Sequence, residues 1–197
     1  GAGRRAVTVQ TDVADPAQCQ QLVDAAMAAF GRVDVLINNA GVGTAVPATR
    51  ETPDEFRRVI DVNLNGSYWM AQACAKVMQP GSSIINISSV LGLTTAGLPQ
   101  AAYSASKAAV IGLTRDLAQQ WGGRRGIRVN AIAPGFFKSE MTDEYQPGYL
   151  ESQLPRLTLG RMGDSVELAA TAVWLASPAG GYVVGQTIVV DGGLTIS

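Results

Sequence analysis

Tyr103 and Lys107 are the residues of this sequence whose types and spacing most directly suggest chemistry. They stand one helical turn apart in the segment AAYSASKAAV (101–110), whose other residues are small or apolar. Positions i and i+4 of a helix are neighbours, about 5–6 Å apart at Cβ. An ammonium about 4 Å from a phenol stabilises the phenolate by roughly 4 kcal/mol at an effective dielectric near 20. The spacing therefore predicts a proton-transfer pair in which the tyrosine is a general acid or base.

An ordinary pair on a helix surface is the alternative interpretation, so the rest of the composition has to narrow the chemistry. The chain contains no histidine, which excludes a Ser-His-Asp triad, a histidine general base and imidazole-ligated zinc. Cys19 and Cys74 fall inside expected helices without the spacing of metal ligands. We therefore expect two buried or half-buried thiols in a reducing compartment and no metal site.

The composition predicts one domain over residues 1–197, with 47% apolar and 16% charged residues. The net charge is −1, and the 15 basic residues are scattered, which gives no stripe for nucleic acid and no polybasic membrane anchor. The longest apolar runs are about strand length, well short of the roughly 20 residues that span a bilayer. No apolar segment of a signal peptide is visible at the start. We expect a soluble, cytoplasmic protein.

Strand-like apolar runs alternate with helical patterns, which predicts right-handed βαβ crossovers and a parallel sheet covered by helices on both faces. The run at 33–41 is continuously apolar, as a strand buried on both faces requires. Gly122-Gly123 is expected to end the longest helix. The expected strands cover 6–11, 33–41, 82–89, 126–135 and 185–193, the expected helices cover 16–30, 52–79, 101–121 and 164–176, and a loop with short helical pieces covers 138–163.

Polar and small residues follow four of these expected strands. They are Asp12, Asn38–Gly41, Ser88–Ser89 and Pro134–Gly135. In open α/β sheets, ligands bind outside the carboxyl ends of the strands. The sequence therefore predicts a binding site at this edge of the sheet.

These motifs resemble the short-chain dehydrogenase/reductase family. Asn38–Gly41, Asn63, Ser89, Tyr103–Lys107 and Pro134–Gly135 occur in that family's order and at about its spacings, over essentially the whole chain. The resemblance implies a Rossmann-type, doubly wound parallel sheet with helices on both faces. It also implies hydride transfer between NAD(H) or NADP(H) and a carbonyl or alcohol.

The resemblance assigns four catalytic residues. Tyr103 looks like the acid/base, and Lys107 would make its hydroxyl more acidic and hydrogen-bond the nicotinamide ribose. Ser89 resembles the serine that holds the substrate oxygen, whereas Ser88 is expected to bond backbone at the strand end. Asn63 would lie in a helix bulge and fix a water that links Lys107 to solvent.

The resemblance also implies a set of cofactor contacts. Each group also has a purely structural alternative, which is helix capping for Asp12, a tight turn for Asn39–Gly41 and strand termination for Pro134–Gly135. The implied contacts are Asp12 to the adenine with Val13 beside the ring, Asn39, Ala40 and Gly41 along the ribose and the turn near the nicotinamide, Pro134, Gly135 and the backbone of Phe137 at the carboxamide, and Ser139 through its hydroxyl, besides Tyr103 and Lys107.

The sequence departs from the family at its start, where no glycine-rich phosphate loop opens a helix. By register the first expected strand is the family's third, in a strand order of 3-2-1-4-5-6-7. Strands 1 and 2 and the first helix are therefore absent, which predicts a two-strand gap between 6–11 and 33–38. We expect several tens of residues before Gly1 in the native protein. The choice between NAD and NADP stays open, because the acidic or basic residue that distinguishes the two nucleotides follows the second strand, which is missing here.

The substrate is expected to be a moderately apolar alcohol or ketone, beneath a lid at about 138–163 with its mobile part at 141–157. Packing of loop side chains on one another is the alternative. The expected lining is Leu91, Leu93, Leu98, Met141, Tyr145, Tyr149 and Leu150.

Two other functions remain open at this point: a lyase or epimerase on the same fold, and a non-catalytic regulatory or scaffold protein. The resemblance further implies a homotetramer, or a homodimer, with contacts through 53–79, 101–121 and 187–190. Nucleic acid and membranes are not expected as partners.

Overall fold

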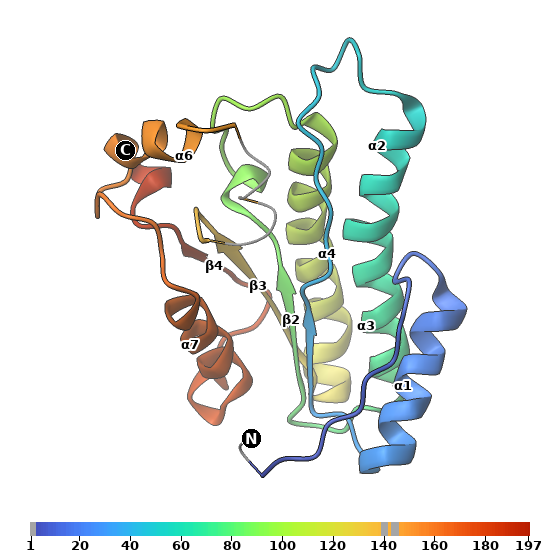
Figure 1. The fold of residues 1–197 in the computed structure, drawn as a ribbon. Helices are drawn as coiled ribbons and strands as arrows, with labels where there is room; N and C mark the ends of the chain where they lie inside the picture. Colours follow the sequence, from blue (N-terminus) through green and yellow to red (C-terminus); the bar gives the residue numbers. More distant parts are fainter. Residues whose placement is uncertain (1–2, 139–141, 143–145) are drawn as a thin grey trace.

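The computed structural model describes residues 3–138, 142 and 146–197. Its sheet has four parallel strands, and their order is that of the chain. Within the described residues, the strands are β1 (Val35–Asn38), β2 (Ser83–Ile87), β3 (Arg128–Pro134) and β4 (Thr187–Val190) (Figure 1). The prediction of a parallel α/β sheet is confirmed.

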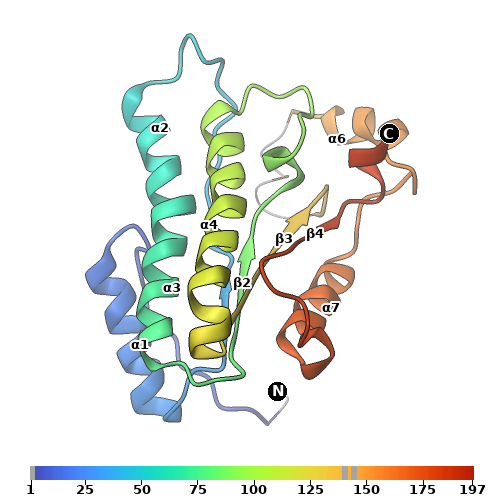
Figure 2. The ribbon, with the colours of Figure 1, turned by 180° about the vertical axis from the view of Figure 1, so that it is seen from behind.

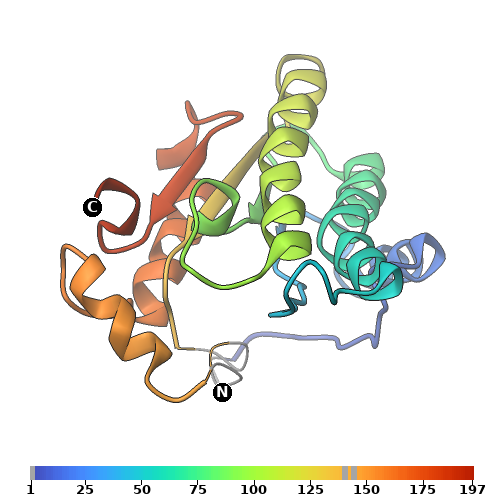
Figure 3. The same ribbon diagram turned by 90° about the horizontal axis from the view of Figure 1, so that it is seen from above.

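Helices cover both faces of this sheet, as predicted. On one face lie α3 (Gly66–Val77) and α4 (Ala101–Arg125), with α1 (Pro16–Phe30) packed against α3 (Figures 1 and 2). On the other face lies α7 (Ser165–Ala176) (Figure 3). Each strand packs side chains against the helices on both faces, because successive residues point to opposite faces of the sheet.

The core shows this alternation at β2. Ile84 is fully buried in the cluster that faces α3 and α4, where Met70 and Leu117 also lie. Ile85, the next residue, is fully buried on the opposite face against Leu175 of α7. Each face of the strand therefore contributes to its own apolar cluster, and the sheet is fixed between the two helical layers.

A chain of buried side-chain amides joins the sheet to the helices just below the strand ends. Asn38 Nδ2 donates to Asn86 Oδ1 (2.9 Å) and to the Ser67 carbonyl of α3 (2.9 Å). Asn86 Nδ2 donates to Thr114 Oγ1 of α4 (2.9 Å). Because these polar groups are satisfied only in one arrangement, they fix the register of β1 against β2.

The helix expected at 52–79 is interrupted. It begins as α2 (Pro53–Ile60) with a capping box at Thr52 and Glu55, then widens into a π-helical turn at Asp61–Asn65 before α3. The turn contains Asn63, so the bulge that the resemblance implied is present.

The segment 6–11, expected as a strand, forms none and runs as an extended trace towards α1 (Figure 1). A strand needs a hydrogen-bonding neighbour, and in the described sheet β1 is the edge on that side. The prediction that β1 is buried on both faces is wrong. Val35 and Ile37, which share one face of the strand, are 42% and 48% exposed, whereas the other face packs against α3.

Gly122 and Gly123 do not end α4, which continues to Arg125. The end comes at Gly126, whose φ of +66° lies in the left-handed region and whose N–H donates to the Gly122 carbonyl (3.0 Å). In the segment expected as a lid, the described residues form α6 (Tyr149–Gln153) and a 3-10 turn at Leu154–Arg156. No helix in the described part of the chain is long and apolar enough to span a membrane.

Candidate active site

A cavity of about 510 Å³ opens at the carboxyl ends of the strands. A larger depression of about 770 Å³ lies at their amino ends, but it contains none of the predicted site residues. The cavity at the carboxyl ends is lined by eight of the predicted catalytic and cofactor-binding residues: Asn39, Gly41, Ser89, Tyr103, Lys107, Pro134, Gly135 and Phe137. It is also lined by Ile87, Val90, Phe136, Thr142 and Leu168, which the sequence analysis did not identify.

Tyr103 and Lys107 lie side by side on α4, and both are buried, with 8% and 4% of their surface exposed. Lys107 Nζ is 5.5 Å from the centre of the Tyr103 ring, within reach for an attraction between cation and aromatic face. It also donates to the Ile87 carbonyl at the end of β2 (2.8 Å). Burial lowers the pKa of Lys107 to about 8, so the side chain is still mostly an ammonium at pH 7.

The end of β2 holds the Lys107 turn of α4 from a second direction. Ser88 Oγ donates to the Lys107 carbonyl (2.8 Å). At Gly92, in the 3-10 turn Val90–Gly92, a Cβ would lie 2.8 Å from the Lys107 carbonyl carbon. Glycine therefore permits this turn to approach the helix backbone closely.

Ser88 and Ser89 face different groups. Both serines border the cavity, but the Ser88 hydroxyl is used in its bond to the helix backbone. Ser89 Oγ accepts from the Leu91 N–H (3.1 Å), and within the described chain it donates to no other group. Its O–H is therefore oriented by the turn and available as a donor towards the cavity.

Asn63 does not line the cavity, although it is buried directly behind it. Its Oδ1 accepts from the Val42 N–H (2.8 Å), and its Nδ2 donates to the Val42 carbonyl and to Ser106 Oγ (both 2.9 Å). A Cβ on Gly41 would lie 3.3 Å from Asn63 Oδ1 and 3.4 Å from Lys107 Nζ. Asn63 thus clamps the turn after β1 onto α4 close to Lys107, and the water relay stays a prediction.

The opposite wall of the cavity is the loop Pro134–Phe137 after β3. At Gly135, a Cβ would lie 2.7 Å from Cα of Asp191, so the loop passes directly against the end of β4. The Gly163 N–H donates to the Phe136 carbonyl (3.0 Å). This wall is therefore held from two sides.

Several predicted cofactor contacts lie elsewhere. Asp12 Oδ1 accepts from the Ala14 N–H (3.0 Å), and Asp12 borders a separate depression with Arg57 and Arg58. Val13 packs against Gly66 of α3, where a Cβ would be 2.7 Å from Val13 Cγ2. Ala40 is exposed and does not line the cavity, and Ser139 lies outside the described residues.

The substrate side also differs in part from the prediction. Leu91 lines the cavity, whereas Leu93 is 50% exposed and Leu98, Tyr149 and Leu150 do not line it. Met141 and Tyr145 lie outside the described residues. Tyr149 instead donates to the Ala96 carbonyl (2.8 Å) and joins α6 to the loop before α4. No spacing in the sequence indicated that contact.

The chain resembles known proteins over nearly all of its length. A family model described as enoyl-(acyl carrier protein) reductase matches residues 1–195. The 3-oxoacyl-[acyl-carrier-protein] reductase FabG of Thermotoga maritima is 42% identical over 188 residues, which cover 94% of this chain and 75% of that protein. The galactitol 2-dehydrogenase (L-tagatose-forming) of Cereibacter sphaeroides is 39% identical over 197 residues, covering 97% and 76%.

A solved structure has the same fold. A short-chain dehydrogenase from Burkholderia cenocepacia in complex with NADP superposes with a TM-score of 0.93 at 33% identity, covering 98% of this chain and 78% of that one. Fold and relatives together define an NAD(P)-dependent oxidoreductase of the doubly wound α/β type. The chain belongs to the short-chain dehydrogenase/reductase family, as its motifs indicated, and it spans about three quarters of the length of these relatives.

Proposed function

We propose that this protein interconverts a secondary alcohol and a ketone with NAD(H) or NADP(H), using Tyr103, Lys107, Ser89 and Asn63. The observation that carries the proposal is the shared cavity, in which Tyr103, Lys107 and Ser89 line one wall and the loop Pro134–Phe137 lines the other. A substrate between the walls would meet a phenol and an aliphatic hydroxyl together.

The residues present fit the nicotinamide end of the cofactor. Gly41 leaves open the space in front of Lys107 Nζ that a Cβ would fill, and this space suits a ribose hydroxyl. Asn39 and Gly135 also line the cavity, and both are small or polar, as a carboxamide and a flat ring require. Solved relatives of this chain hold NADP or NADPH, which supports this class of cofactor.

The chain's own residues would act on the substrate oxygen. A bound nicotinamide nucleotide supplies the hydride in reduction and accepts it in oxidation. During reduction, the Tyr103 hydroxyl donates its proton to that oxygen, and the Ser89 O–H donates a hydrogen bond to it. The Lys107 ammonium beside the ring stabilises the phenolate that remains. Asn63 keeps the adjoining turn in place through Val42.

Absorbance at 340 nm tests the proposal. The chain is assayed alone and fused at its N terminus to the segment that precedes the matched region in the Thermotoga reductase. The panel contains NADH, NADPH, 3-oxoacyl thioesters, ketoses and simple aliphatic ketones. We expect turnover by the fused protein with at least one ketone, and loss of turnover in Tyr103→Phe. Nucleotide binding without turnover on the whole panel would support a non-catalytic role instead.

We further propose a cytoplasmic homotetramer or homodimer. Support comes from the two free, buried cysteines, which suit a reducing compartment, and from exposed apolar side chains on and beside α7 and β4. These side chains include Val166 (72% exposed), Val173 (67%) and Tyr182 (fully exposed). Light scattering after size-exclusion chromatography would measure the oligomeric state, and a monomer at micromolar concentration would contradict the proposed oligomer.

A further inference from the structure

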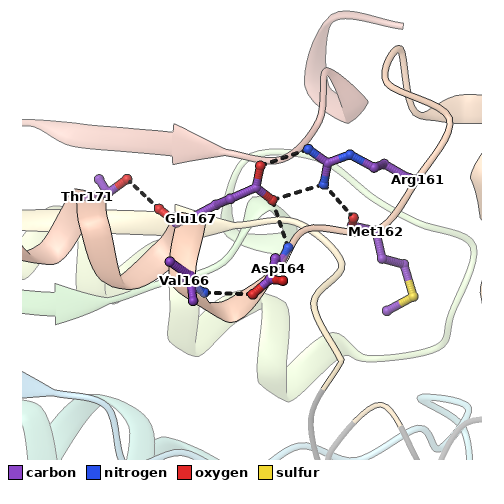
Figure 4. A network of polar contacts seen from close by, with 6 residues as sticks. All are labelled: Arg161, Met162, Asp164, Val166, Glu167 and Thr171. Atoms are coloured by element: carbon purple, nitrogen blue, oxygen red, sulfur yellow. Dashed lines mark hydrogen bonds and ion pairs between the residues drawn. The ribbon is translucent and has the colours of Figure 1, made fainter.

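Glu167, in the first turn of α7, is the centre of a network of polar contacts (Figure 4), and with Arg161 it borders a small hollow that Phe136 and Phe137 of the wall also line. Its Oε1 accepts from Arg161 Nη2 (2.7 Å), and its Oε2 accepts from Arg161 Nη1 (2.9 Å) and from the Asp164 N–H (2.8 Å). Arg161 Nη1 also donates to the Met162 carbonyl (3.0 Å). The paired donors give a two-point contact of fixed geometry, which we call the Arg161–Glu167 clamp.

The two residues of the clamp flank Gly163 in the sequence, and Gly163 contacts the cavity wall. Gly163 lies between Arg161 and Asp164, and its N–H donates to the Phe136 carbonyl (3.0 Å). It pairs with Phe137 in a parallel bridge, and a Cβ on Gly163 would overlap the Phe137 ring. The backbone at Gly163 thus lies directly on the wall, in a position that any side chain would disturb.

Helix capping alone does not account for this arrangement. The capping box of α7 needs only the reciprocal bonds of Asp164 and Glu167, and these are present. Arg161 adds a bidentate ion pair that ties the chain before the cap to the helix. Leu168, the residue after Glu167, lines the same cavity as Phe136 and Phe137, so α7 reaches the cavity directly beside the clamp.

We propose that the Arg161–Glu167 clamp is a positioning device for the Pro134–Phe137 wall. By fixing residues 161–164 against α7, it holds Gly163 on Phe136 and Phe137 and so sets the surface against which the ligand binds. The identity of that ligand, the nicotinamide end of NAD(P), rests on the proposed function. The position of the wall is independent of the proposed function.

Hydrogen–deuterium exchange on the chain without nucleotide tests the positioning. Glu167→Gln keeps a residue that completes a capping box but removes the ion pair, so it separates the clamp from the cap. We expect exchange in the segment 134–138 and at Gly163 to rise about threefold, because local opening becomes easier. Arg161→Lys, which keeps the charge but loses the fork, should raise it similarly.

The matched control is Asp34→Asn, which breaks another exposed, bidentate pair, Arg32–Asp34 (2.7 and 2.8 Å), before β1. Its exchange in 134–138 should stay as in the parent. The proposal is overturned if neither clamp variant changes that segment, or if Asp34→Asn changes it equally.

Titration of the fused protein with NADPH, followed by nicotinamide fluorescence, tests whether the position of the wall affects nucleotide binding. Glu167→Gln should raise the dissociation constant about threefold to tenfold, with a smaller change in kcat. An unchanged dissociation constant alongside raised exchange would overturn the link to binding. If the parent binds no nucleotide, the proposed function fails, and the exchange comparison still decides the positioning role.

Discussion

The two walls of the cavity are held in place by different kinds of contact. The α4 wall is fixed by a buried hydrogen bond from Ser88 Oγ to the Lys107 carbonyl and by a partly buried one from Lys107 Nζ to the Ile87 carbonyl. The Pro134–Phe137 wall is braced by a clamp whose side chains are about half exposed, at 53% for Arg161 and 45% for Glu167.

This difference separates the two tasks of the site. Buried polar groups become costly when a partner is lost, so they hold one geometry firmly. Exposed ion pairs contribute little to stability and are screened by salt. The groups assigned to proton transfer are thus fixed by the core, while the wall assigned to ligand binding depends in part on the surface. Substitutions on the first wall should change catalysis or stability, and substitutions at the second should change binding.

Tyr103→Phe should give the largest effect. It removes the proposed proton donor and keeps the ring against Lys107, so we expect kcat to fall about a thousandfold with the melting temperature nearly unchanged. Rates at 340 nm and thermal melts would measure both. Tyr68→Phe on α3, whose hydroxyl accepts only from Gln72 (3.3 Å) among the described residues, is the control. A loss under tenfold in Tyr103→Phe would remove the proton-transfer role from this wall.

Lys107 should make stability depend on pH. Burial lowers its pKa from 10.5 to about 8 in the folded chain. Between these values an unfolded Lys107 binds more protons than the folded one, so its contribution to stability rises with pH, by about 3 kcal/mol in total, while the raised pKa values of Cys19 and Cys74 contribute in the opposite direction. Below pH 8 the full cost of the buried ammonium is present.

Urea unfolding at pH 7 to 10.5 would measure this slope in the parent and in Lys107→Met, which should lack it. Lys76→Met, at an exposed lysine of α3, should keep the parental slope. Equal slopes in the parent and Lys107→Met would mean that the ammonium is not buried as described.

Gly92→Ala should destabilise the chain by about 1–3 kcal/mol, because its Cβ would meet helix backbone at Lys107 and Ala108, which cannot rotate away. Gly112→Ala within α4 is the control, since nothing lies within 4 Å of its Cβ, and it should stabilise by about 0.5–1 kcal/mol. Denaturant midpoints would measure both. A neutral Gly92→Ala would show that the turn and α4 are not in close contact.

The sequence predicted the parallel sheet and most of the cavity for a physical reason. Hydrophobic period and turn residues act locally, and parallel strands bring their carboxyl ends together. Ser89 could therefore be assigned to this edge and Tyr103 paired with Lys107 from spacing, while the family resemblance brought the three residues together. The Ile87 carbonyl could not, because every residue carries the same backbone acceptor and only the fold selects one.

The features that the sequence could not show share a cause, which is dependence on distant partners. The segment 6–11 has the composition of a strand, but a strand forms only beside another strand. The Arg161–Glu167 clamp joins exposed residues whose types also suit an ordinary surface. Asp12 could not be placed relative to the cavity, because its position follows from packing of Val13 on Gly66.

The smallest predicted effect compares the two walls directly. Ser88→Ala removes one buried hydrogen bond to α4 and should cost about 1 kcal/mol, with the same value at low and high salt. Glu167→Gln should cost less than Ser88→Ala, and its effect should shrink further in 1 M NaCl, where the screening length is about 3 Å. Denaturant unfolding at two salt concentrations would measure both differences. If the cost of Ser88→Ala fell with salt as that of Glu167→Gln does, the distinction between a wall held by the core and a wall held by the surface would be wrong.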